Sequence, residues 1–407
     1  MICEDMWNPK VAKSLAQKKA DILISINGSP FELGKMKERL SLARTRAKEN
    51  KLPMIYLNQI GGQDELVFDG NSFLMSPNGT QVLRMPSWKE SLMYGRWNNV
   101  RKQWLTPSKE KSNNINNDLK NIYHALVLGL RDYVRKNKFK GVIIGLSGGI
   151  DSALTATIAV DALGSESVQC VMMPSPFTST ASLIDAKKVS RNLGIQFKNI
   201  SIQPAIRSFK RMIEKNAKLR VLTNVFDNIQ ARSRGVTLMS LSNTNGYLVL
   251  STGNKSETSV GYVTIYGDMC GGYAVLKDIY KTTVYELAKW RNKNFSHQFL
   301  GANQSIIPSR VFSKAPTAEL HRNQKDQDIL PPYKKLDGIL KHFLEEDMGV
   351  QQVIKRGYSA KIVKKIWQML ILAEYKRRQS PPGIKVTKRA FGRDRRYPIT
   401  NRFFDWP

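Results

Sequence analysis

Short apolar runs alternate with helix-length amphipathic segments along most of this chain. Four runs rich in Val, Ile and Leu indicate buried strands: 142–146, 168–174, 195–202 and 247–250. Helices are expected at 118–137, 152–162, 182–193 and 223–241. Repeated βα units of this length predict an α/β fold with a doubly wound parallel sheet. Ligands of such a sheet bind at the carboxyl ends of its strands.

The first 88 residues have a different pattern. Strands are expected at 20–27 and 52–60, a basic helix at 35–51, and a hairpin at 66–83 with a turn at Asn78-Gly79. This order suggests part of an α/β sandwich. Residues 89–117 are polar and have no sustained period, which is typical of a linker. We therefore expect domains at 1–88 and 118–407, the second with a polar lid at 296–328 and helices at 336–344 and 360–377.

The sequence SGGIDS, Ser147–Ser152, lies between a predicted strand and a predicted helix. A glycine turn at a helix N-terminus directs backbone N–H groups at an anion, and the helix dipole favours negative charge there. The P-loop pattern GxxxxGK[ST] and the pattern GxGxxG do not occur at this place. Asp151 would repel a phosphate unless a divalent cation lay between them, which suggests Mg²⁺ on a polyphosphate. An ordinary turn with an acidic first helical turn is the alternative interpretation.

Composition adds limits to this picture. The net charge of +31 favours contact with polyanions, whether nucleic acid, anionic membrane or phosphorylated metabolites. Three distant cysteines give neither a disulfide framework nor a zinc spacing, so a reducing cytoplasm is expected. No apolar run is long enough to span a membrane, and the N-terminus has no signal-peptide pattern.

Several further motifs follow in order. YLVLSTGNKSE ends a strand with small and polar residues, where Thr252 could contact a nucleotide and Glu257 could add a second carboxylate for a metal. Seven motifs occur in this order along the second domain: SGGIDS, FDNIQAR, STGNKSETSVGYVTIYGD, YKTTVYELA, KAPTAEL, DILPPY and EYKRRQSPPG. Together these motifs resemble the glutamine-dependent NAD synthetases, which contain an ATP-pyrophosphatase domain (PP-loop, adenine nucleotide α hydrolase-like). KAPTAEL has one proline where the family has two.

The resemblance implies a set of site residues. ATP would contact Gly145, Leu146, Ser147, Gly148, Gly149, Ile150, Asp151, Ser152, Thr252, Lys281 and Thr317. Deamido-NAD would contact Asn228, Arg232, Glu257 and Lys376, and Mg²⁺ would be held by Asp151 and Glu257. The implied reaction adenylates the nicotinate carboxylate of deamido-NAD with ATP, releasing pyrophosphate. Ammonia then displaces AMP to give NAD.

The opening residues resemble a second family domain. ICEDMW and NGSPFELGK are similar to two stretches of the nitrilase-like glutaminase domain, in which Cys3 would be the nucleophile and Ser29 and Lys35 would bind glutamine. A buried structural cysteine is the plainer interpretation of a lone thiol. In the family a glutamate and a lysine that precede this cysteine activate it. We therefore expect a chain that lacks the N-terminal half of this domain, has an impaired glutaminase and uses free ammonia.

Two other functions fit some of these features. A PP-loop tRNA-modifying enzyme would suit the net charge, but such enzymes typically need a tRNA-binding appendage or a catalytic cysteine pair, and the chain has no CxxC. A nucleotide-binding or nucleic-acid-binding protein with a relic loop is the non-enzymatic alternative. We expect small-molecule substrates, no specific nucleic acid or membrane partner, and a homo-oligomer.

Overall fold

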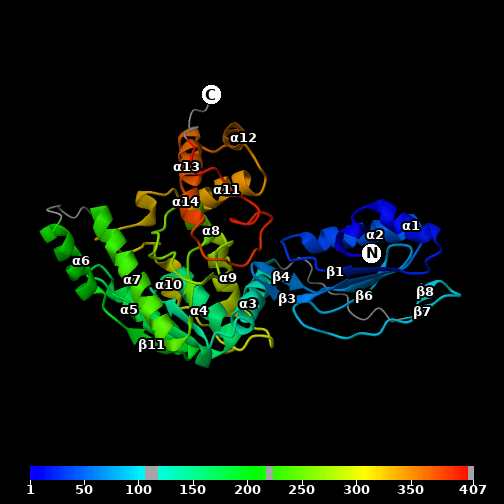
Figure 1. Ribbon diagram of the computed structural model, residues 1–407, viewed down its shortest axis with the longest axis horizontal. Coiled ribbons are helices and arrows are strands. Elements are labelled where there is room, and N and C mark those ends of the chain that lie inside the picture. Colours follow the sequence, from blue (N-terminus) through cyan, green and yellow to red (C-terminus); the bar gives the residue numbers. More distant parts are fainter. Residues whose placement is uncertain (106–117, 217–222, 402–407) are drawn as a thin grey trace. The chain divides into compact units, whose positions relative to one another are not determined.

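The computed structural model describes residues 1–105, 118–216 and 223–401. It divides into two compact units, Met1–Asp132 and Tyr133–Pro407 (Figure 1). The helix α3, Asp118–Lys136, forms where the apolar pattern predicted it, and its residues Ile122 and Leu126 are buried. The division falls within this helix, whereas the sequence pattern placed the whole helix in the second domain.

Unit 1 is built on a four-stranded mixed sheet in the order β1-β2-β5-β6. Its elements are η1 (Cys3–Met6), α1 (Pro9–Gln17), β1 (Leu23–Asn27), α2 (Lys35–Asn50), β2 (Met54–Asn58), β5 (Phe73–Met75) and β6 (Gln81–Arg84). Strands β1 and β2 are parallel, and β5 is antiparallel to both β2 and β6. Leu40 and Ala43 of α2 pack with Leu23, Met54 and Phe73 of the sheet to form its core.

Two details of unit 1 differ from the expected pattern. The hairpin expected at 66–83 is β5–β6, whose turn contains Gly79 with a φ of +80°. Strand β4, Leu66–Asp69, pairs instead with β3, Ile60–Gln63, in a separate ribbon. In the segment 89–117, Trp97 and Trp104 face each other across a short hairpin of β7 (Trp97–Asn98) and β8 (Gln103–Trp104). The rest of that segment, 106–117, lies outside the described residues.

Unit 2 contains the predicted parallel sheet. Its strands are β9 (Val142–Gly145), β10 (Val168–Met172), β11 (Gln196–Asn199), β12 (Leu248–Ser251) and β13 (Tyr273–Ala274). They lie in the order β11-β10-β9-β12-β13, and all neighbours are parallel. Every residue of β10 and β12 is buried, as expected of a sheet covered on both faces. The α/β fold class is therefore confirmed.

Helices follow the strands of this sheet in chain order. They are α4 (Ile150–Leu163), α5 (Thr180–Leu193), α6 (Gln203–Asn216) and α7 (Thr223–Asn245). One face of the sheet presents Ile143 and Val249, which pack with Ile229 and Leu238 of α7 and Ile206 of α6. A buried ion pair links Asp161 of α4 to Arg291 of α9 (Lys281–Lys293), with Nε–Oδ2 at 2.6 Å.

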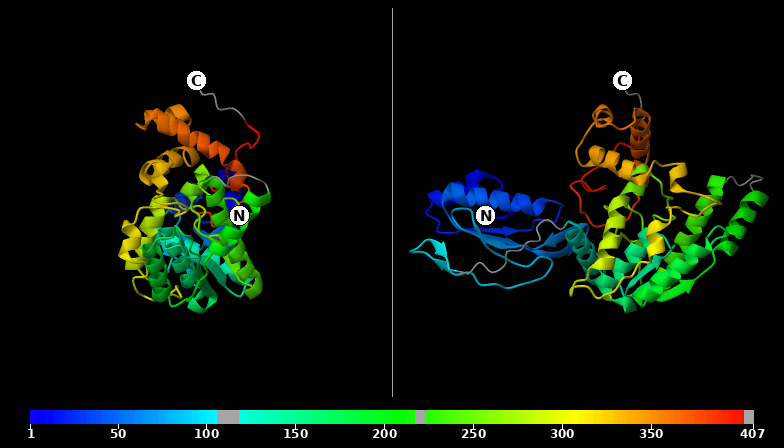
Figure 2. Two further views of the ribbon diagram at one scale, coloured as in Figure 1. Left: turned by 90° about the vertical axis from the view of Figure 1, so that its left-hand side faces the viewer. Right: turned by 180° about the vertical axis from the view of Figure 1, so that it is seen from behind.

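The C-terminal helices gather around α8 (Lys255–Val260) at one side of unit 2 (Figure 2). They are α11 (Tyr333–Leu344), α12 (Val350–Lys355), α13 (Ala360–Leu372) and α14 (Glu374–Arg377). The single helix expected at 360–377 is wrong, because α13 ends at Leu372. Arg377 of α14 folds back and donates to the carbonyl oxygen of Leu370 at 2.6 Å, a group that the ended helix leaves without a partner in its own backbone.

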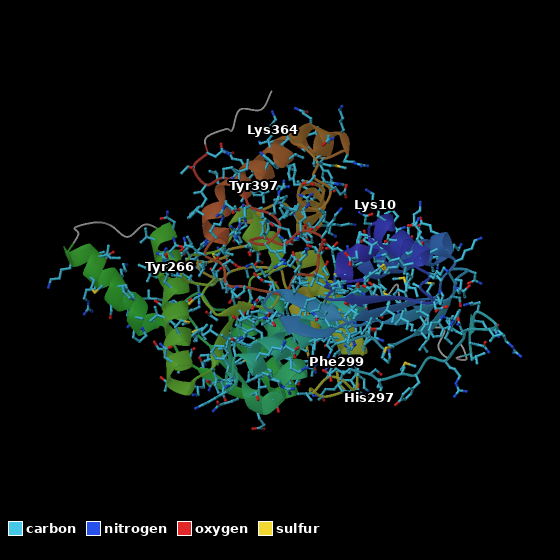
Figure 3. All side chains as sticks on the ribbon, turned by 45° about the vertical axis from the view of Figure 1, so that its right-hand side comes forward. Lys10, Tyr266, His297, Phe299, Lys364 and Tyr397 are labelled. Carbon is cyan, nitrogen blue, oxygen red and sulfur yellow. The ribbon has the colours of Figure 1, made fainter. Side chains whose placement is uncertain are left out.

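The segment expected as a lid, 296–328, contains α10 (Ser309–Ser313) and η3 (Asp326–Asp328). It is hydrogen-bonded to its surroundings, for example from Asn192 Nδ2 to the carbonyl oxygen of Ile306 at 2.7 Å. Lysines such as Lys10 and Lys364 lie exposed on helix surfaces (Figure 3). Within the described ranges, no helix has the length and apolar character needed to cross a bilayer.

Candidate active site

The loop between β9 and α4 forms part of a cavity at the carboxyl ends of the parallel strands. Gly148 has a φ of +81°, and a β-carbon at this position would lie 2.4 Å from the carbonyl oxygen of Ser182. Only glycine fits such a position. Gly149 is the N-cap residue of α4 and supplies no side-chain cap, so backbone N–H groups of the first turn can serve an anion.

Hydroxyl groups hold this loop in shape. Ser147 Oγ accepts a hydrogen bond from the N–H of Gly149 at 3.2 Å, and it lies 3.0 Å from Ser152 Oγ. Ser152 Oγ also donates to the carbonyl oxygen of Gly149 at 3.1 Å. The loop is therefore fixed before a ligand arrives, which reduces the entropy lost on binding.

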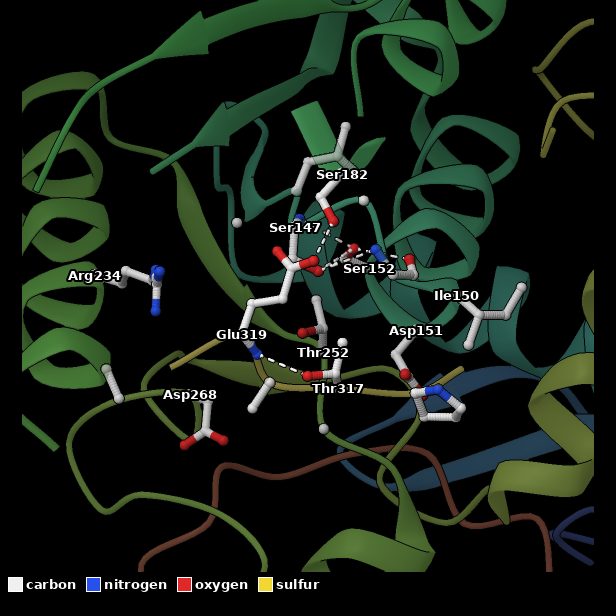
Figure 4. Close-up of a pocket in the computed structure, with 18 of the residues that line it drawn as sticks. Ser147, Ile150, Asp151, Ser152, Ser182, Arg234, Thr252, Asp268, Thr317 and Glu319 are labelled. Atoms are coloured by element: carbon white, nitrogen blue, oxygen red, sulfur yellow. Dashed lines mark hydrogen bonds between the residues drawn. The ribbon is translucent and has the colours of Figure 1, made fainter. Parts of the chain in front are cut away.

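The cavity has a volume of about 280 Å³ and reaches from the loop to α7 and to the segment after α10 (Figure 4). It is lined by the expected residues Gly145–Ser152, Thr252, Glu257, Lys281 and Thr317. It is also lined by residues that sequence reasoning did not select, among them Arg234, Asp268, Lys314, Glu319 and Asp326.

A buried ammonium joins the two expected carboxylates. Lys281 Nζ lies 2.5 Å from Asp151 Oδ2 and 2.8 Å from Glu257 Oε1, and the Lys281 side chain is 4% exposed. Asn254 secures both acids, because it donates to Asp151 Oδ1 at 2.8 Å and accepts from the N–H of Glu257 at 3.0 Å. Three elements far apart in the sequence are thereby tied together at one point.

The protonation of this cluster follows from its burial. Burial raises the pKa of Glu257 to about 7, while the Lys281 ammonium lowers it and the Asp151 carboxylate raises it. Burial also works against the charge of Lys281, but Asp151 and Glu257 outweigh this and raise its pKa above the usual value. Lys281 is therefore charged at neutral pH, whereas Glu257 gains or loses its proton near pH 7.

A third acid lies beside this cluster. Asp326 Oδ2 accepts a hydrogen bond from the Tyr333 hydroxyl at 2.8 Å, and the same hydroxyl lies 3.2 Å from Glu257 Oε1. Burial raises the pKa of Asp326, although the Tyr333 hydrogen bond and the Lys281 charge lower it. Among the described residues, no group of three His, Cys, Asp or Glu side chains could hold a metal ion by itself.

Three other expected residues converge on the segment 261–265, of which Thr264 lines the cavity. Asn228 Oδ1 accepts from the Thr264 hydroxyl at 3.1 Å, and Arg232 Nε donates to the carbonyl oxygen of Ile265 at 3.2 Å. Lys376 Nζ donates to the carbonyl oxygens of Gly261 and Val263, each at 2.7 Å. None of the three lines the cavity itself, so they surround one of its walls.

Arg234 lines the cavity from α7, and the spacing of residues along one face of this helix could have indicated it. Ala231, Arg234, Gly235 and Leu238 of α7 all line the cavity, at the i, i+3, i+4, i+7 spacing of one helix face. Burial lowers the pKa of Arg234, and the charges of Glu319 and Asp268 raise it. By contrast, the neighbouring Arg232 lies on an exposed face.

Cys3 lies in unit 1, at the start of η1. Its backbone adopts a φ of +44°, a left-handed conformation that costs a non-glycine residue about 1–3 kcal/mol and is often kept at functional positions. Ile2, directly before it, bridges to Ile26 at the edge of β1. The Cys3 side chain is partly exposed.

Ser29 and Lys35 each have other partners in this unit. Ser29 Oγ accepts from Arg39 Nε at 3.0 Å, and Arg39 forms a buried ion pair with Asp69 at 2.7 Å. Lys35 Nζ lies 2.9 Å from Glu38 Oε2 and 4.2 Å from the centre of the Trp7 ring. Sequence reasoning missed Arg39, since a basic residue inside a basic helix gives no separate signal.

The Tyr56 hydroxyl lies within electrostatic reach of Ser29 and Cys3. Burial raises the pKa of the Tyr56 hydroxyl, the charge of Arg39 and a hydrogen bond with Ser29 lower it, and the charges of Asp69 and Cys3 raise it. Ser29 and Cys3 therefore both act on the Tyr56 hydroxyl.

Two family models match the chain. The NAD synthase family matches residues 122–380, and the carbon-nitrogen hydrolase family matches residues 1–104. The glutamine-dependent NAD(+) synthetase of Rhodobacter capsulatus is 44% identical over 416 aligned residues, which cover 99% of this chain and 73% of that protein.

Two solved structures also match the chain. The glutamine-dependent NAD+ synthetase of Acinetobacter baumannii, in complex with ADP, matches with a TM-score of 0.72 at 43% identity, covering 98% of this chain and 72% of that one. The NMN synthetase of Francisella tularensis matches with a TM-score of 0.53 at 27% identity and covers 63% of this chain and 95% of that one.

The Lys281 cluster generates a prediction about stability. Lys281→Met removes the ammonium and leaves two carboxylates facing each other, which should lower the free energy of unfolding by roughly 3–5 kcal/mol at pH 8. The loss should be smaller at pH 6. The pKa of Glu257 is already raised in the folded protein, and it should rise further without the Lys281 ammonium. At pH 6 the carboxyl group of the variant is then mostly protonated and repels Asp151 little. As the pH increases, Glu257 loses this proton and the folded state of the variant loses stability. Urea unfolding at pH 6, 7 and 8 measures the effect.

The control for this change is Lys289→Met, which removes an exposed lysine from the same helix. It should alter stability little at any of these pH values. An equal loss for Lys281→Met at pH 6 and pH 8 would show that its charge does not compensate the two acids.

Proposed function

The chain belongs to the glutamine-dependent NAD(+) synthetase family, and we propose that its unit 2 cavity is where this ligase converts deamido-NAD to NAD with ATP. The observation that carries this proposal is the convergence of the anion loop, Asp151, Glu257 and Lys281 on one cavity. The ADP complex of the Acinetobacter relative supports an adenine nucleotide as one substrate.

The phosphates of ATP would lie on the loop Ser147–Ser152. Backbone N–H groups and the positive end of α4 favour anionic oxygens there. Thr252 and Thr317 supply hydroxyl groups from the other walls, and Lys281 supplies a positive charge. Because the loop, Thr317 and Lys281 are held in place by their own hydrogen bonds, they would stabilise developing charge with little reorganisation.

Mg²⁺ fits the donor set of this cavity. Asp151 and Glu257 already share one cation, the Lys281 ammonium, so their oxygens converge on a single point. Carboxylate oxygens are the preferred ligands of Mg²⁺, and phosphate oxygens and water complete its shell. When bound, the metal would offset the charge of the phosphate chain. The affinity of the cavity for Mg²⁺ should rise as the pH increases through about 7, because Glu257 must lose its proton to act as a ligand.

We propose that deamido-NAD lies against the segment 261–265. Asn228, Arg232 and Lys376 all hold this segment, and Arg234 and Glu257 line the cavity next to it. The guanidinium and ammonium groups would offset the charge of a second polyanion brought close to ATP. Binding both substrates rigidly is the main requirement for an in-line reaction.

The proposed reaction has two steps. A carboxylate oxygen of deamido-NAD attacks the α-phosphorus of ATP, the bond to the bridging oxygen breaks, and pyrophosphate leaves. Ammonia then attacks the carbonyl carbon of the adenylate, and AMP leaves with the bonding electrons and a proton is released. The residues of this chain bind, orient and neutralise, and none needs to form a covalent bond.

The ammonia source concerns unit 1. We propose that Cys3 is the nucleophile of glutamine hydrolysis, as its strained backbone and the carbon-nitrogen hydrolase match support. Ser29 and Lys35 would bind glutamine, but each is engaged with another partner, Arg39 and Glu38 respectively. We therefore propose that residues 1–407 use free ammonia more readily than glutamine.

Assembly and location are also proposals. Exposed apolar side chains gather on two neighbouring helices, Phe209 and Met212 on α6 and Val236 and Met239 on α7. Such a surface supports a homo-oligomer. The cytoplasmic location is proposed separately, from the cysteine pattern of the sequence. The alternative of a tRNA-modifying enzyme has no support in the matched families. Such an enzyme would need a reactive cysteine. Cys170 is the only cysteine on the parallel sheet among the described residues, and it is fully buried, which strongly raises the pKa of its thiol.

Asp151→Asn tests the ATP step. The change keeps the shape of the side chain but removes the charge that would hold Mg²⁺, so the rate of NAD formation should fall by about 100-fold or more. AMP, pyrophosphate and NAD should fall together. The control is Asp21→Asn at an exposed position of unit 1. Near-normal turnover of Asp151→Asn at saturating Mg²⁺ would remove Asp151 from the proposed site.

Cys3→Ala tests the ammonia source. Purified residues 1–407 should make NAD with ammonium chloride and only slowly with glutamine. The alanine variant should lose the glutamine-supported rate and keep the ammonium-supported rate, because only the first requires a thiol nucleophile. The readout is NAD formed from each nitrogen source. Equal rates with glutamine and ammonium in the unmodified chain would contradict the preference for free ammonia.

A further inference from the structure

The cavity contains a second ion pair besides the Lys281 cluster. Lys314 follows α10 directly, and its Nζ lies 2.8 Å from Glu319 Oε1. The two residues begin and nearly end the sequence KAPTAEL, which also carries Thr317. Lys314, Thr317 and Glu319 all line the cavity.

Glu319 is held by the N-terminal end of α5. Its Oε1 accepts hydrogen bonds from Ser179 Oγ and Ser182 Oγ, each at 2.8 Å, and its Oε2 accepts from the N–H of Ser179 at 3.3 Å. Lys314 Nζ also contacts Ser182 Oγ. Ser179 is the N-cap residue of α5, so the carboxylate lies where the helix dipole favours negative charge.

This carboxylate is next to the anion loop. Gly148 packs so closely on Ser182 that it has no room for a β-carbon, so the α5 N-terminus and the loop are direct neighbours. Figure 4 shows the Glu319 side chain pointing toward Ser147 and Ser182. The hydroxyl and ammonium donors around Glu319 are the same kinds of donor that bind phosphate oxygens.

The charge and the backbone of Glu319 both have consequences. Burial opposes its ionisation, but hydrogen bonds from Lys314, Ser182 and Ser179 outweigh this and lower its pKa, so it is an anion at neutral pH. Its backbone has a φ of +48°, a conformation that costs a non-glycine residue about 1–3 kcal/mol. The contacts of the carboxylate therefore retain a strained backbone.

A phosphate chain and this carboxylate would repel each other at such close range, because like charges are poorly screened in a partly buried site. We propose that Glu319 and the phosphates of ATP exclude each other, and that Lys314 exchanges Glu319 for a phosphate oxygen when ATP binds. This inference rests on the proposed function only for the identity of the nucleotide.

The segment is anchored so that this exchange needs little movement. Gln230 Nε2 donates to the carbonyl oxygen of Leu320 at 2.7 Å, and the N–H of Asp326 donates to the carbonyl oxygen of Pro316 at 3.2 Å. These bonds hold the segment on both sides of Glu319. The Glu319 side chain and its own backbone torsion can change while the anchors stay, and leaving the left-handed conformation releases strain.

The test measures the dissociation constants of ATP and of inorganic pyrophosphate by calorimetry. The variants are Glu319→Gln, Lys314→Met and the double variant. Glu319→Gln removes the competing anion, so both ligands should bind roughly ten-fold more tightly. Lys314→Met should weaken binding, and by a larger factor in the Glu319→Gln background. When Glu319 is present, Lys314→Met also removes one of the contacts that hold the Glu319 carboxylate near the loop. The carboxylate then competes less with phosphate, and this gain partly offsets the loss of the Lys314 ammonium.

Two further sets of variants control this test. Glu319→Gly removes the carboxylate and suits the left-handed backbone, so it should tighten ATP binding even if Glu319→Gln proves poorly folded. Lys210 and Glu214 form an exposed ion pair on α6 with Nζ–Oε1 at 3.8 Å. Lys210→Met and Glu214→Gln make the same changes of charge away from the cavity, and they should leave both dissociation constants unchanged.

Each outcome has a definite meaning. Unchanged or weaker binding in both Glu319 variants would overturn the exclusion and make Glu319 a structural tie. An unchanged affinity for Lys314→Met in the Glu319→Gln background would overturn the exchange. NAD formation is measured separately. If the affinities change as expected but no NAD forms, the proposed function fails and this inference stands; if NAD forms normally and the affinities do not change, only this inference fails.

Discussion

The buried ammonium of Lys281 is the interaction on which the rest of the site depends. It neutralises Asp151 from the anion loop and Glu257 from α8, two acids that would otherwise repel each other in a poorly solvated cavity. Because Lys281 begins α9, the same contact fixes where three elements meet. We propose that a divalent cation joins this cluster together with the phosphates of ATP, whose charge offsets that of the added cation.

Most of the architecture was predictable from the sequence, because its signals are local. The β-branched run before SGGIDS predicted β9 within a few residues. The four-residue spacing of apolar residues in 118–137 predicted α3 equally well. Helices α6 and α9 were not predicted. Helix α9 has a weak amphipathic period, because basic and polar residues interrupt its apolar positions, as in YELAKWRNK. Helix α6 has a clear one, with Ile206, Phe209 and Ile213 at helical spacing, and the sequence interpretation overlooked it.

The site was predictable only in part, for a physical reason. Motif resemblance selected the loop, Thr252, Glu257, Lys281 and Thr317, and these residues line one cavity. It did not select Glu319, whose importance comes from contacts with residues about 140 positions earlier in the chain. Pairings of this kind depend on how helices end and loops cross, which no single segment encodes.

The central claim is that the nicotinate carboxylate is activated by transfer of the adenylyl group. The most direct measurement uses deamido-NAD labelled with ¹⁸O in that carboxylate, ATP and ammonium, followed by mass spectrometry of the products. The account predicts one ¹⁸O atom in the phosphate of AMP for each NAD formed, because the attacking oxygen leaves with AMP. Unlabelled AMP, or ADP accompanied by labelled inorganic phosphate, would contradict it.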